Sequence, residues 1–198
     1  MSGQPLIAVP CKSLAFGKSR LAGLLDQPER ESLCRGLLAN TLRLAAEVAG
    51  KNNVRLVSPD AEAKQIAAAQ EIATDATNWP DLNAALSGVR QHVLTSGAWT
   101  ELLVLPIDIP LATKESLRTV IADDAVVTIV PDGRESGTNV LKIREPSLRE
   151  FQFAYGDHSF KVHGDAAIKN GWKLSIHRLE DLSFDIDNPA DYVRWEKR

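Results

Sequence analysis

Short apolar runs rich in Val, Ile and Leu alternate along the chain with stretches whose apolar residues recur at helical spacing. Continuous apolar runs bounded by turn residues are typical of strands buried on both faces, and such strands need helices to cover them. The alternation therefore predicts an α/β fold, a mostly parallel sheet with helices on its faces. The expected strands cover residues 6–9, 54–57, 102–105, 125–130, 139–143 and 173–179, and the expected helices with their caps cover 28–49, 61–69, 81–97, 113–121, 159–170 and 188–198.

Length and charge narrow the class of protein further. The chain has 198 residues, of which 44 % are hydrophobic and 25 % are charged. This length suits one medium domain, so residues 1–198 are treated as a single domain. The formal net charge is only −3, and the basic residues are scattered among acids. A nucleic acid partner is not expected, because the basic field that holds a nucleic acid backbone is missing.

Neither a targeting segment nor a disulfide framework is visible in the sequence. No apolar run approaches the roughly 20 residues that cross a bilayer, and no signal peptide precedes the first expected strand. Cys11 and Cys34 fit neither a disulfide pattern nor a zinc pattern. We therefore expect a protein of the reducing cytoplasm with no membrane partner. The sequence leaves a homodimer open, since no exposed apolar stripe requires one.

The loop after the first expected strand carries several positive charges. Its letters Gly17-Lys18-Ser19 look like the end of a Walker phosphate-binding loop, but such a loop needs a glycine where Lys12 stands, so the strict motif fails. Lys12, Lys18 and Arg20 nevertheless place three cations between a strand and a helix. Ligands of open α/β sheets bind beyond the carboxyl ends of strands. The loop therefore either holds nucleotide phosphates or is a solvated surface loop.

Three aspartates lie in two other segments, one after an expected strand and one before an expected helix. Asp108 stands in "PIDIP", directly after the apolar run 102–105, where two prolines prevent regular strand pairing. Asp185 and Asp187 are two residues apart in "FDIDNP" and share one face if that segment is extended. If the two segments meet, three hard oxygen donors suit one or two magnesium ions. The alternative is structural, with Asp108 in a turn and Asp187 assisting a helix cap at Asn188.

A second polar pair, "SGTNVL" and "YGDHSFKVH", offers donors for an anion. Thr138 supplies a hydroxyl group, Gly156 allows a tight turn, and Ser159 stands where a helix is expected to begin. The free N–H groups at a helix start bind anions, so this pair suits a small phosphorylated acid, although the same letters also fit a plain turn and cap. His158 and His163 are five residues apart and match no zinc-ligand spacing.

Six motifs in this order resemble the CofC/FbiD family of guanylyltransferases over residues 5–191: "VPCKSLAFGKSRLA", "DLNAAL", "LPIDIPL", "GTNVL", "YGDHSFKVH" and "FDIDNPAD". The resemblance implies a Rossmann-like α/β/α sandwich of the nucleotide-diphospho-sugar transferase (glycosyltransferase A) type. It also implies transfer of GMP from GTP to the phosphate of phosphoenolpyruvate, 2-phospho-L-lactate or 3-phospho-D-glycerate, with release of pyrophosphate. That reaction belongs to the biosynthesis of the deazaflavin coenzyme F-420.

The resemblance implies roles for the residues at matching positions. The residues expected to face the nucleotide are Lys12, Lys18 and Arg20 at its phosphates and Asn83 near the nucleoside. The residues expected to hold Mg²⁺ are Asp108, Asp185 and Asp187. The residues expected to bind the phosphate and carboxylate of the acceptor are Thr138, Gly156 and Ser159. Lys12 and Asp108 are the expected catalytic residues.

The chemistry of such a transfer fits this inventory. An acceptor phosphate is already ionised at pH 7, so the reaction needs alignment and relief of charge repulsion rather than a general base. One departure leaves the acceptor open, because the family's usual Phe-Gly-Pro-Gly-Ser is here Tyr155-Gly156-Asp157-His158-Ser159. Two alternatives remain: a nucleotidyltransferase for a sugar phosphate or a molybdopterin-type acceptor, and a non-catalytic nucleotide-binding module. The three aspartates argue against the second.

Overall fold

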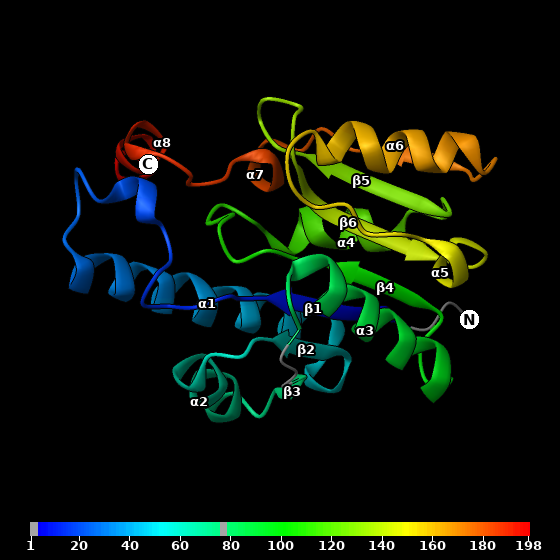
Figure 1. Cartoon of the computed structure of the whole chain (residues 1–198), viewed down its shortest axis with the longest axis horizontal. Helices are drawn as coiled ribbons and strands as arrows, with labels where there is room; N and C mark the ends of the chain where they lie inside the picture. Colours follow the sequence, from blue (N-terminus) through cyan, green and yellow to red (C-terminus); the bar gives the residue numbers. More distant parts are fainter. Residues whose placement is uncertain (1–3, 76–78) are drawn as a thin grey trace.

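One seven-stranded sheet, in the order β3-β2-β1-β4-β6-β5-β7, forms the centre of the molecule (Figure 1). The computed structural model describes residues 4–75 and 79–198. Neighbouring strands are parallel except for β6, which is antiparallel to both β4 and β5, so the mostly parallel sheet is confirmed. The strands are β1 (Leu6–Pro10), β2 (Val54–Val57), β3 (Ala73–Asp75), β4 (Glu101–Val104), β5 (Val127–Pro131), β6 (Thr138–Arg144) and β7 (Leu174–Ile176).

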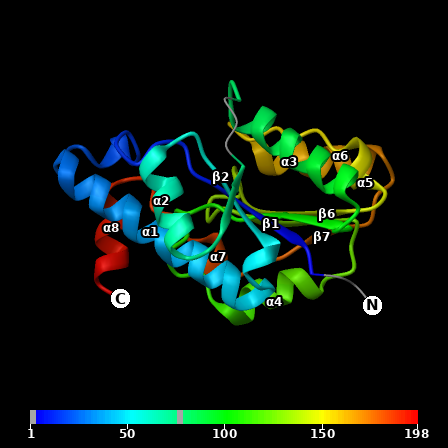
Figure 2. The same ribbon diagram turned by 90° about the horizontal axis from the view of Figure 1, so that it is seen from below.

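Helices cover both faces of the sheet, as Figure 2 shows. One face carries α1, α2, α4 and α7, and the other carries α3, α5 and α6. This arrangement is the predicted α/β/α sandwich. The helices are α1 (Gln27–Ala49), α2 (Ala61–Ala69), α3 (Leu82–Ser96), α4 (Lys114–Ala122), α5 (Ser147–Glu150), α6 (Ser159–Lys169), α7 (Glu180–Ser183) and α8 (Pro189–Glu196), with short 3-10 turns η1 (Ser19–Leu21) and η2 (Lys51–Asn53).

The central strands divide their side chains between two hydrophobic clusters. In β4, Leu103 packs into the cluster beneath α1 and α4, whereas Leu102 and Val104 pack into the cluster beneath α3 and α5. Successive side chains of a strand point to opposite faces, so a strand between two helical layers must be apolar at every position. This is why these strands appear in the sequence as unbroken apolar runs.

Capping side chains begin the helices where the sequence predicts them. Asp81 accepts a hydrogen bond from the backbone of Ala84 at 2.8 Å, and Thr113 accepts one from Ser116 at 3.2 Å. Asn188 caps α8 and is followed by a proline in the first turn. The caps satisfy backbone N–H groups that a helix start otherwise leaves unpaired.

The shortest elements differ from the prediction. The strand expected over 173–179 is reduced to β7, because the chain leaves the sheet edge and turns into α7. The three residues of β3 and the four residues of α5 were not predicted. Elements this short contain no full period of apolar residues, so neither strand nor helix spacing can be read from them.

The antiparallel direction of β6 decides what lies at the carboxyl edge of the sheet. Because β6 runs against β4, its first residue, Thr138, lies at the edge where β1 and β4 end. In Figure 1 this edge faces left, with the loop after β1 below the segment that leads into α8. Residues from four separate parts of the chain therefore meet there. Within the described ranges, none of the helices has the length and apolar character needed to cross a membrane.

Leu103→Ala tests the role of the central strand. Leu103 is fully buried, and we expect its truncation to lower the free energy of unfolding by about 2–5 kcal/mol through lost burial and a cavity. Chemical denaturation measures the loss. Ile168→Ala on α6 is the matched control, because Ile168 is 70 % exposed and its truncation should change stability by at most about 0.5 kcal/mol. Equal losses in the two variants would contradict this assignment of the core.

Candidate active site

Two acidic segments meet at the carboxyl edge of the sheet although they are far apart in the sequence. Asp108 lies in the segment after β4, and Asp185 and Asp187 lie in the segment before α8. The backbone N–H of Ile186 donates a hydrogen bond of 3.0 Å to the carbonyl oxygen of Asp108. This bond fixes the second segment beside the segment that follows β4.

Lys18 links the loop after β1 to both acidic segments. Its Nζ lies 3.1 Å from Asp108 Oδ2, 3.8 Å from Asp187 Oδ1 and 2.5 Å from the carbonyl oxygen of Ile186. Lys18 also has left-handed backbone geometry, with φ of 53°, which is unfavourable for a residue other than glycine. The three contacts hold the residue in this conformation. The letters Gly17-Lys18-Ser19 therefore form a bend that directs a lysine towards carboxylates, not a Walker cradle.

The same bend is packed tightly against α1. A Cβ atom placed on Gly17 would lie 2.6 Å from the Sγ atom of Cys34, so any other residue there would force the loop or Cys34 to shift. Cys11 and Cys34 are both buried beneath the loop. Burial raises the pKa of the Cys11 thiol to about 12 and also raises the pKa of Cys34. Both groups therefore stay protonated at neutral pH, which excludes them as thiolate nucleophiles.

The other two predicted cations differ in their contacts. Arg20 Nη1 lies 3.2 Å from Asp187 Oδ2, and the Arg20 side chain is largely exposed. Lys12 takes part in no ion pair among residues 4–75 and 79–198. Together with Lys18, both residues line a cavity of about 270 Å³ whose wall also includes Asp108 and Asp187. The cavity thus joins three cations to two carboxylates, and none of the described carboxylates neutralises the charge of Lys12.

Asp185 lies on the other side of Asp187. It lines a neighbouring cavity of about 340 Å³ together with Asp132 and Asp187. Burial, followed by the charges of Asp187, Asp108 and Asp132, raises the pKa of Asp185 to about 6. The described residues contain no group of three or more His, Cys, Asp or Glu side chains set to hold a metal ion. The structure thus places Asp108 and Asp187 around one cation, Lys18, and leaves Asp185 in the adjacent cavity.

Asn83 does not line the cavity beside Lys12. Its Nδ2 donates to the carbonyl oxygen of Tyr155 at 3.1 Å, and its Oδ1 accepts from the N–H of Tyr155 at 2.7 Å. Both ends of the amide therefore hold the backbone next to Gly156. The sequence placed Asn83 near the nucleoside by resemblance alone. Nothing in its spacing could have indicated a partner 72 residues away.

The predicted acceptor residues lie together at the start of β6 and α6. The backbone N–H of Thr138 donates to Ser159 Oγ at 2.9 Å, and both residues are buried. Ser159 begins α6 as predicted, after His158 in left-handed geometry and Gly156 with φ of 141°. A φ of this size is accessible only to glycine without strain. The turn brings the first residues of α6 against the first residue of β6.

His163 is a functional candidate that sequence reasoning missed. Its imidazole is fully buried, with Nδ1 at 3.0 Å from Thr138 Oγ1 and Nε2 accepting from the N–H of Ala154 at 3.0 Å. Burial lowers the pKa of His163 to about 4, so the ring is neutral at pH 7. In the sequence, His163 shows only that its spacing from His158 matches no zinc site. Its position four residues after the start of α6 could have suggested contact with the acceptor motif.

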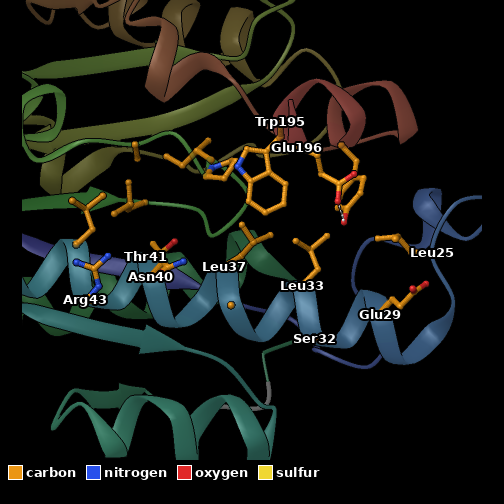
Figure 3. A pocket seen from close by; sticks show the side chains of 17 residues that line it. Leu25, Glu29, Ser32, Leu33, Leu37, Asn40, Thr41, Arg43, Trp195 and Glu196 are labelled. Carbon is orange, nitrogen blue, oxygen red and sulfur yellow. Dashed lines mark hydrogen bonds between the residues drawn. The ribbon is translucent and has the colours of Figure 1, made fainter. Parts of the chain in front are cut away.

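A larger cavity lies elsewhere in the described chain. It has a volume of about 820 Å³ and lies between α1 and α8, where Trp195 points towards Leu33 and Leu37 (Figure 3). None of the predicted site residues lines it. Two of its charged residues are already paired, since Glu29 accepts from a backbone N–H in the α1 capping box and Arg43 pairs with Glu47. The smaller cavity beside Lys12 is therefore the better candidate for binding an anionic nucleotide.

An α/β/α sandwich that gathers cations and carboxylates beyond its strand ends is suited to binding a nucleotide, and the family match identifies the protein as a nucleotidyltransferase. The model of the family described as guanylyl transferase, CofC-like, matches residues 6–194, and the chain belongs to this family. It is 36 % identical to a phosphoenolpyruvate guanylyltransferase of Rubrobacter xylanophilus over 95 % of this chain and 91 % of the relative. It is 33 % identical to a 2-phospho-L-lactate guanylyltransferase of Methanosphaerula palustris, over 96 % and 82 %.

Solved structures share the fold at low sequence identity. A protein described as a nucleotide-diphospho-sugar transferase, from Desulfovibrio desulfuricans G20, superposes with a TM-score of 0.75 at 15 % identity, covering 95 % of this chain and 84 % of the other. Rv0371C of Mycobacterium tuberculosis H37Rv, solved in complex with manganese, superposes with a TM-score of 0.59 at 14 % identity over 100 % of both chains. The first of these likenesses agrees with the predicted transferase fold.

The buried neutral state of His163 predicts an acid-dependent loss of stability. Its pKa of about 4 in the folded protein lies below the value of about 6.5 in an unfolded chain, so the unfolded state binds more protons between these values. We expect the free energy of unfolding to fall by roughly 3 kcal/mol from this group as pH decreases from about 6.5 to about 4. Denaturation of the wild type and of His163→Asn across this range isolates the contribution. A wild-type pH slope no steeper than that of the variant would contradict a buried neutral imidazole.

Proposed function

We propose that the protein transfers GMP from GTP to the phosphate of a small phospho-acid, phosphoenolpyruvate, 2-phospho-L-lactate or 3-phospho-D-glycerate, and releases pyrophosphate. Family membership supports the reaction. The observation that supports its assignment to this site is the Lys18 contact, which joins Asp108 and Asp187 to the cationic loop after β1. The product would serve the biosynthesis of coenzyme F-420, in line with the CofC-like family.

The cationic loop supplies charge for the nucleotide. A triphosphate carries about four negative charges, and one fixed cation at ~4 Å contributes on the order of 4 kcal/mol before desolvation, at an effective dielectric of about 20. Lys12 offers its charge directly, because no carboxylate among the described residues neutralises it. Lys18 and Arg20 reach the same cavity from the other side, in contact with Asp187. These residues bind and align the phosphates. Lys12 stabilises the negative charge that develops on the leaving pyrophosphate.

The two carboxylates that contact Lys18 are suited to binding a divalent cation. Asp108 and Asp187 already place oxygen atoms around one positive group, and oxygen donors of this kind are those that Mg²⁺ prefers. Asp185 would add a third donor from the neighbouring cavity. A bound Mg²⁺ would reduce repulsion between nucleotide and acceptor anions. The manganese in the Mycobacterium tuberculosis neighbour supports a divalent metal for the fold, while magnesium itself belongs to this proposal.

The acceptor would bind against Thr138, Gly156 and Ser159. Hydroxyl and backbone N–H donors gather there, and the nucleotide cavity lies along the same sheet edge. The names of the two relatives differ in the acceptor, phosphoenolpyruvate in one and 2-phospho-L-lactate in the other. Because an ionised acceptor phosphate needs no general base, the absence of a titrating histidine from the reaction causes no difficulty.

Pyrophosphate release tests the reaction directly. The protein is incubated with GTP, Mg²⁺ and each of the three phospho-acids in turn, and we expect pyrophosphate to form with at least one of them. Omission of the acceptor is the control, since hydrolysis of GTP alone would give a signal independent of transfer. Pyrophosphate formed only with a sugar phosphate would show that the acceptor class is wrong.

Asp108→Asn tests the catalytic role of the first acidic segment. The substitution preserves size and removes the charge, and we expect kcat to fall by at least ~100-fold, about 2.7 kcal/mol of barrier. Asp124→Asn is the matched control, because Asp124 is exposed and pairs with Lys173, the residue directly before β7. The control variant should keep wild-type turnover. Near-normal kcat in a correctly folded Asp108→Asn protein would remove Asp108 from the mechanism.

A further inference from the structure

His163 lies between the two segments that carry the proposed acceptor residues, the start of β6 and the turn before α6. It lies on α6, its Nδ1 is 3.0 Å from Thr138 Oγ1 on β6, and its Nε2 accepts from Ala154 in the segment that leads to Gly156. The ring is also in edge contact with Tyr155, with centroids 5.1 Å apart. One imidazole on α6 thus contacts both the start of β6 and the segment that enters the Gly156 turn. The proposed reaction gives it no role as acid or base.

The two hydrogen bonds determine the tautomer of the imidazole. A backbone N–H is always a donor, so Nε2 must accept the bond from Ala154 with its lone pair. A neutral imidazole with a lone pair on Nε2 carries its hydrogen on Nδ1. Nδ1 therefore donates to Thr138 Oγ1. If Nε2 of the buried imidazole were protonated, its N–H would face the N–H of Ala154, and these two donors would lack an acceptor between them.

This tautomer also determines what the Thr138 hydroxyl group offers. Its oxygen already accepts from His163, and this is the one hydrogen bond of Thr138 Oγ1 within residues 4–75 and 79–198. The hydroxyl hydrogen remains available to donate to another group. Ser159 has the same arrangement, because its Oγ accepts from the N–H of Thr138. Thr138 and Ser159 therefore carry two hydroxyl groups that each accept one hydrogen bond from the protein, and their hydrogens are available to donate to an anion.

The segment that leads into the Gly156 turn is fixed by the same imidazole of His163. The Nε2 contact holds Ala154, and the amide of Asn83 holds the next residue, Tyr155, at both its N–H and its carbonyl oxygen. Gly156, which allows the turn into α6, follows directly. The backbone that enters the turn therefore cannot shift without breaking one of these contacts.

We propose that His163 is a positioning residue for the acceptor: its Nδ1–H holds the Thr138 hydroxyl group as a donor to the acceptor's phosphate or carboxylate, while its Nε2 fixes the Gly156 turn. The inference rests on the proposed function, because it assumes that the phospho-acid binds at Thr138 and Ser159. His163 transfers no proton in this role. It acts on substrate only through Thr138 and the turn.

The first experiment separates acceptor binding from the rest of the reaction. KM for phosphoenolpyruvate, or for whichever of the three phospho-acids the wild type uses, is measured at saturating GTP for His163→Leu and His163→Asn. His163→Leu removes both hydrogen bonds, and we expect acceptor KM to rise roughly 10- to 100-fold with KM for GTP unchanged. Asn carries a donor near the position of Nδ1, and His163→Asn should recover most of the acceptor affinity. A purely structural role predicts a smaller active fraction with both KM values unchanged.

A double-mutant cycle tests whether His163 acts through Thr138. Thr138→Val should raise acceptor KM strongly in the wild type and only slightly in the His163→Leu background, because the positioned hydroxyl is already lost there. Thr128→Val is the matched control on the neighbouring strand β5. Thr128 is likewise a buried strand threonine, but its hydroxyl has no hydrogen-bond partner among the described residues. This control should leave both KM values unchanged.

A spectroscopic measurement covers the case in which the leucine variant does not fold. Long-range ¹H–¹⁵N correlation spectra of the wild type should show one protonated ring nitrogen, Nδ1, for His163 from pH 7 down to about pH 5. A hydrogen on Nε2, or independent effects of His163→Leu and Thr138→Val on acceptor KM, would overturn the inference while leaving guanylyl transfer intact. No turnover of any phospho-acid by the wild type would instead refute the proposed function.

Discussion

The ion cluster around Lys18 is the constraint on which the site depends. Its ammonium group is largely buried and lies between carboxylates from two segments that share no secondary structure. Without a positive group at this position, Asp108 and Asp187 would repel each other, and the segment before α8 would lose its attachment to the loop after β1. A nucleotide phosphate that attracts Lys18 and Arg20 would leave the two aspartates without counter-charge. Phosphate binding at the loop and cation binding at the aspartates are therefore expected to reinforce each other.

The fold was predictable where an element spans at least one full period of its pattern. The apolar run 102–105 and the helix over 61–69 appear in the structure almost as the sequence predicts, because burial on both faces or on one stripe leaves a visible pattern. The three-residue β3 and the four-residue α7 leave none. Their formation depends on neighbours, since β3 pairs with β2 at the sheet edge and α7 packs against β5 and β6. Tertiary contact of this kind cannot be read from local spacing.

The site was predictable in part because of the same regularity. Parallel strands place their carboxyl ends on one edge, so residues that directly follow β1 and β4 were expected to meet, and Lys18 and Asp108 do. The contacts of Asn83 and His163 were not predictable. Each satisfies a backbone or side-chain group far away in the sequence, and a single amide or imidazole gives no periodic signal. The division of the aspartates between two cavities likewise depends on how the segment before α8 crosses the sheet edge.

The two halves of the site differ in the kind of attraction they offer an anion. The half proposed for the nucleotide carries full charges, because Lys12, Lys18 and Arg20 line its cavity. The half proposed for the acceptor carries neutral donors, the hydroxyl groups of the buried residues Thr138 and Ser159. Charges attract the more highly charged ligand at longer range, whereas buried neutral donors act only at contact distance and require a fitting shape. Under the proposed function, a triphosphate is therefore expected to bind at the loop after β1 and to gain little at the start of β6. Because His163 stays uncharged at neutral pH, the acceptor half keeps this neutral character, and the two anionic substrates can be sorted without a second cationic pocket.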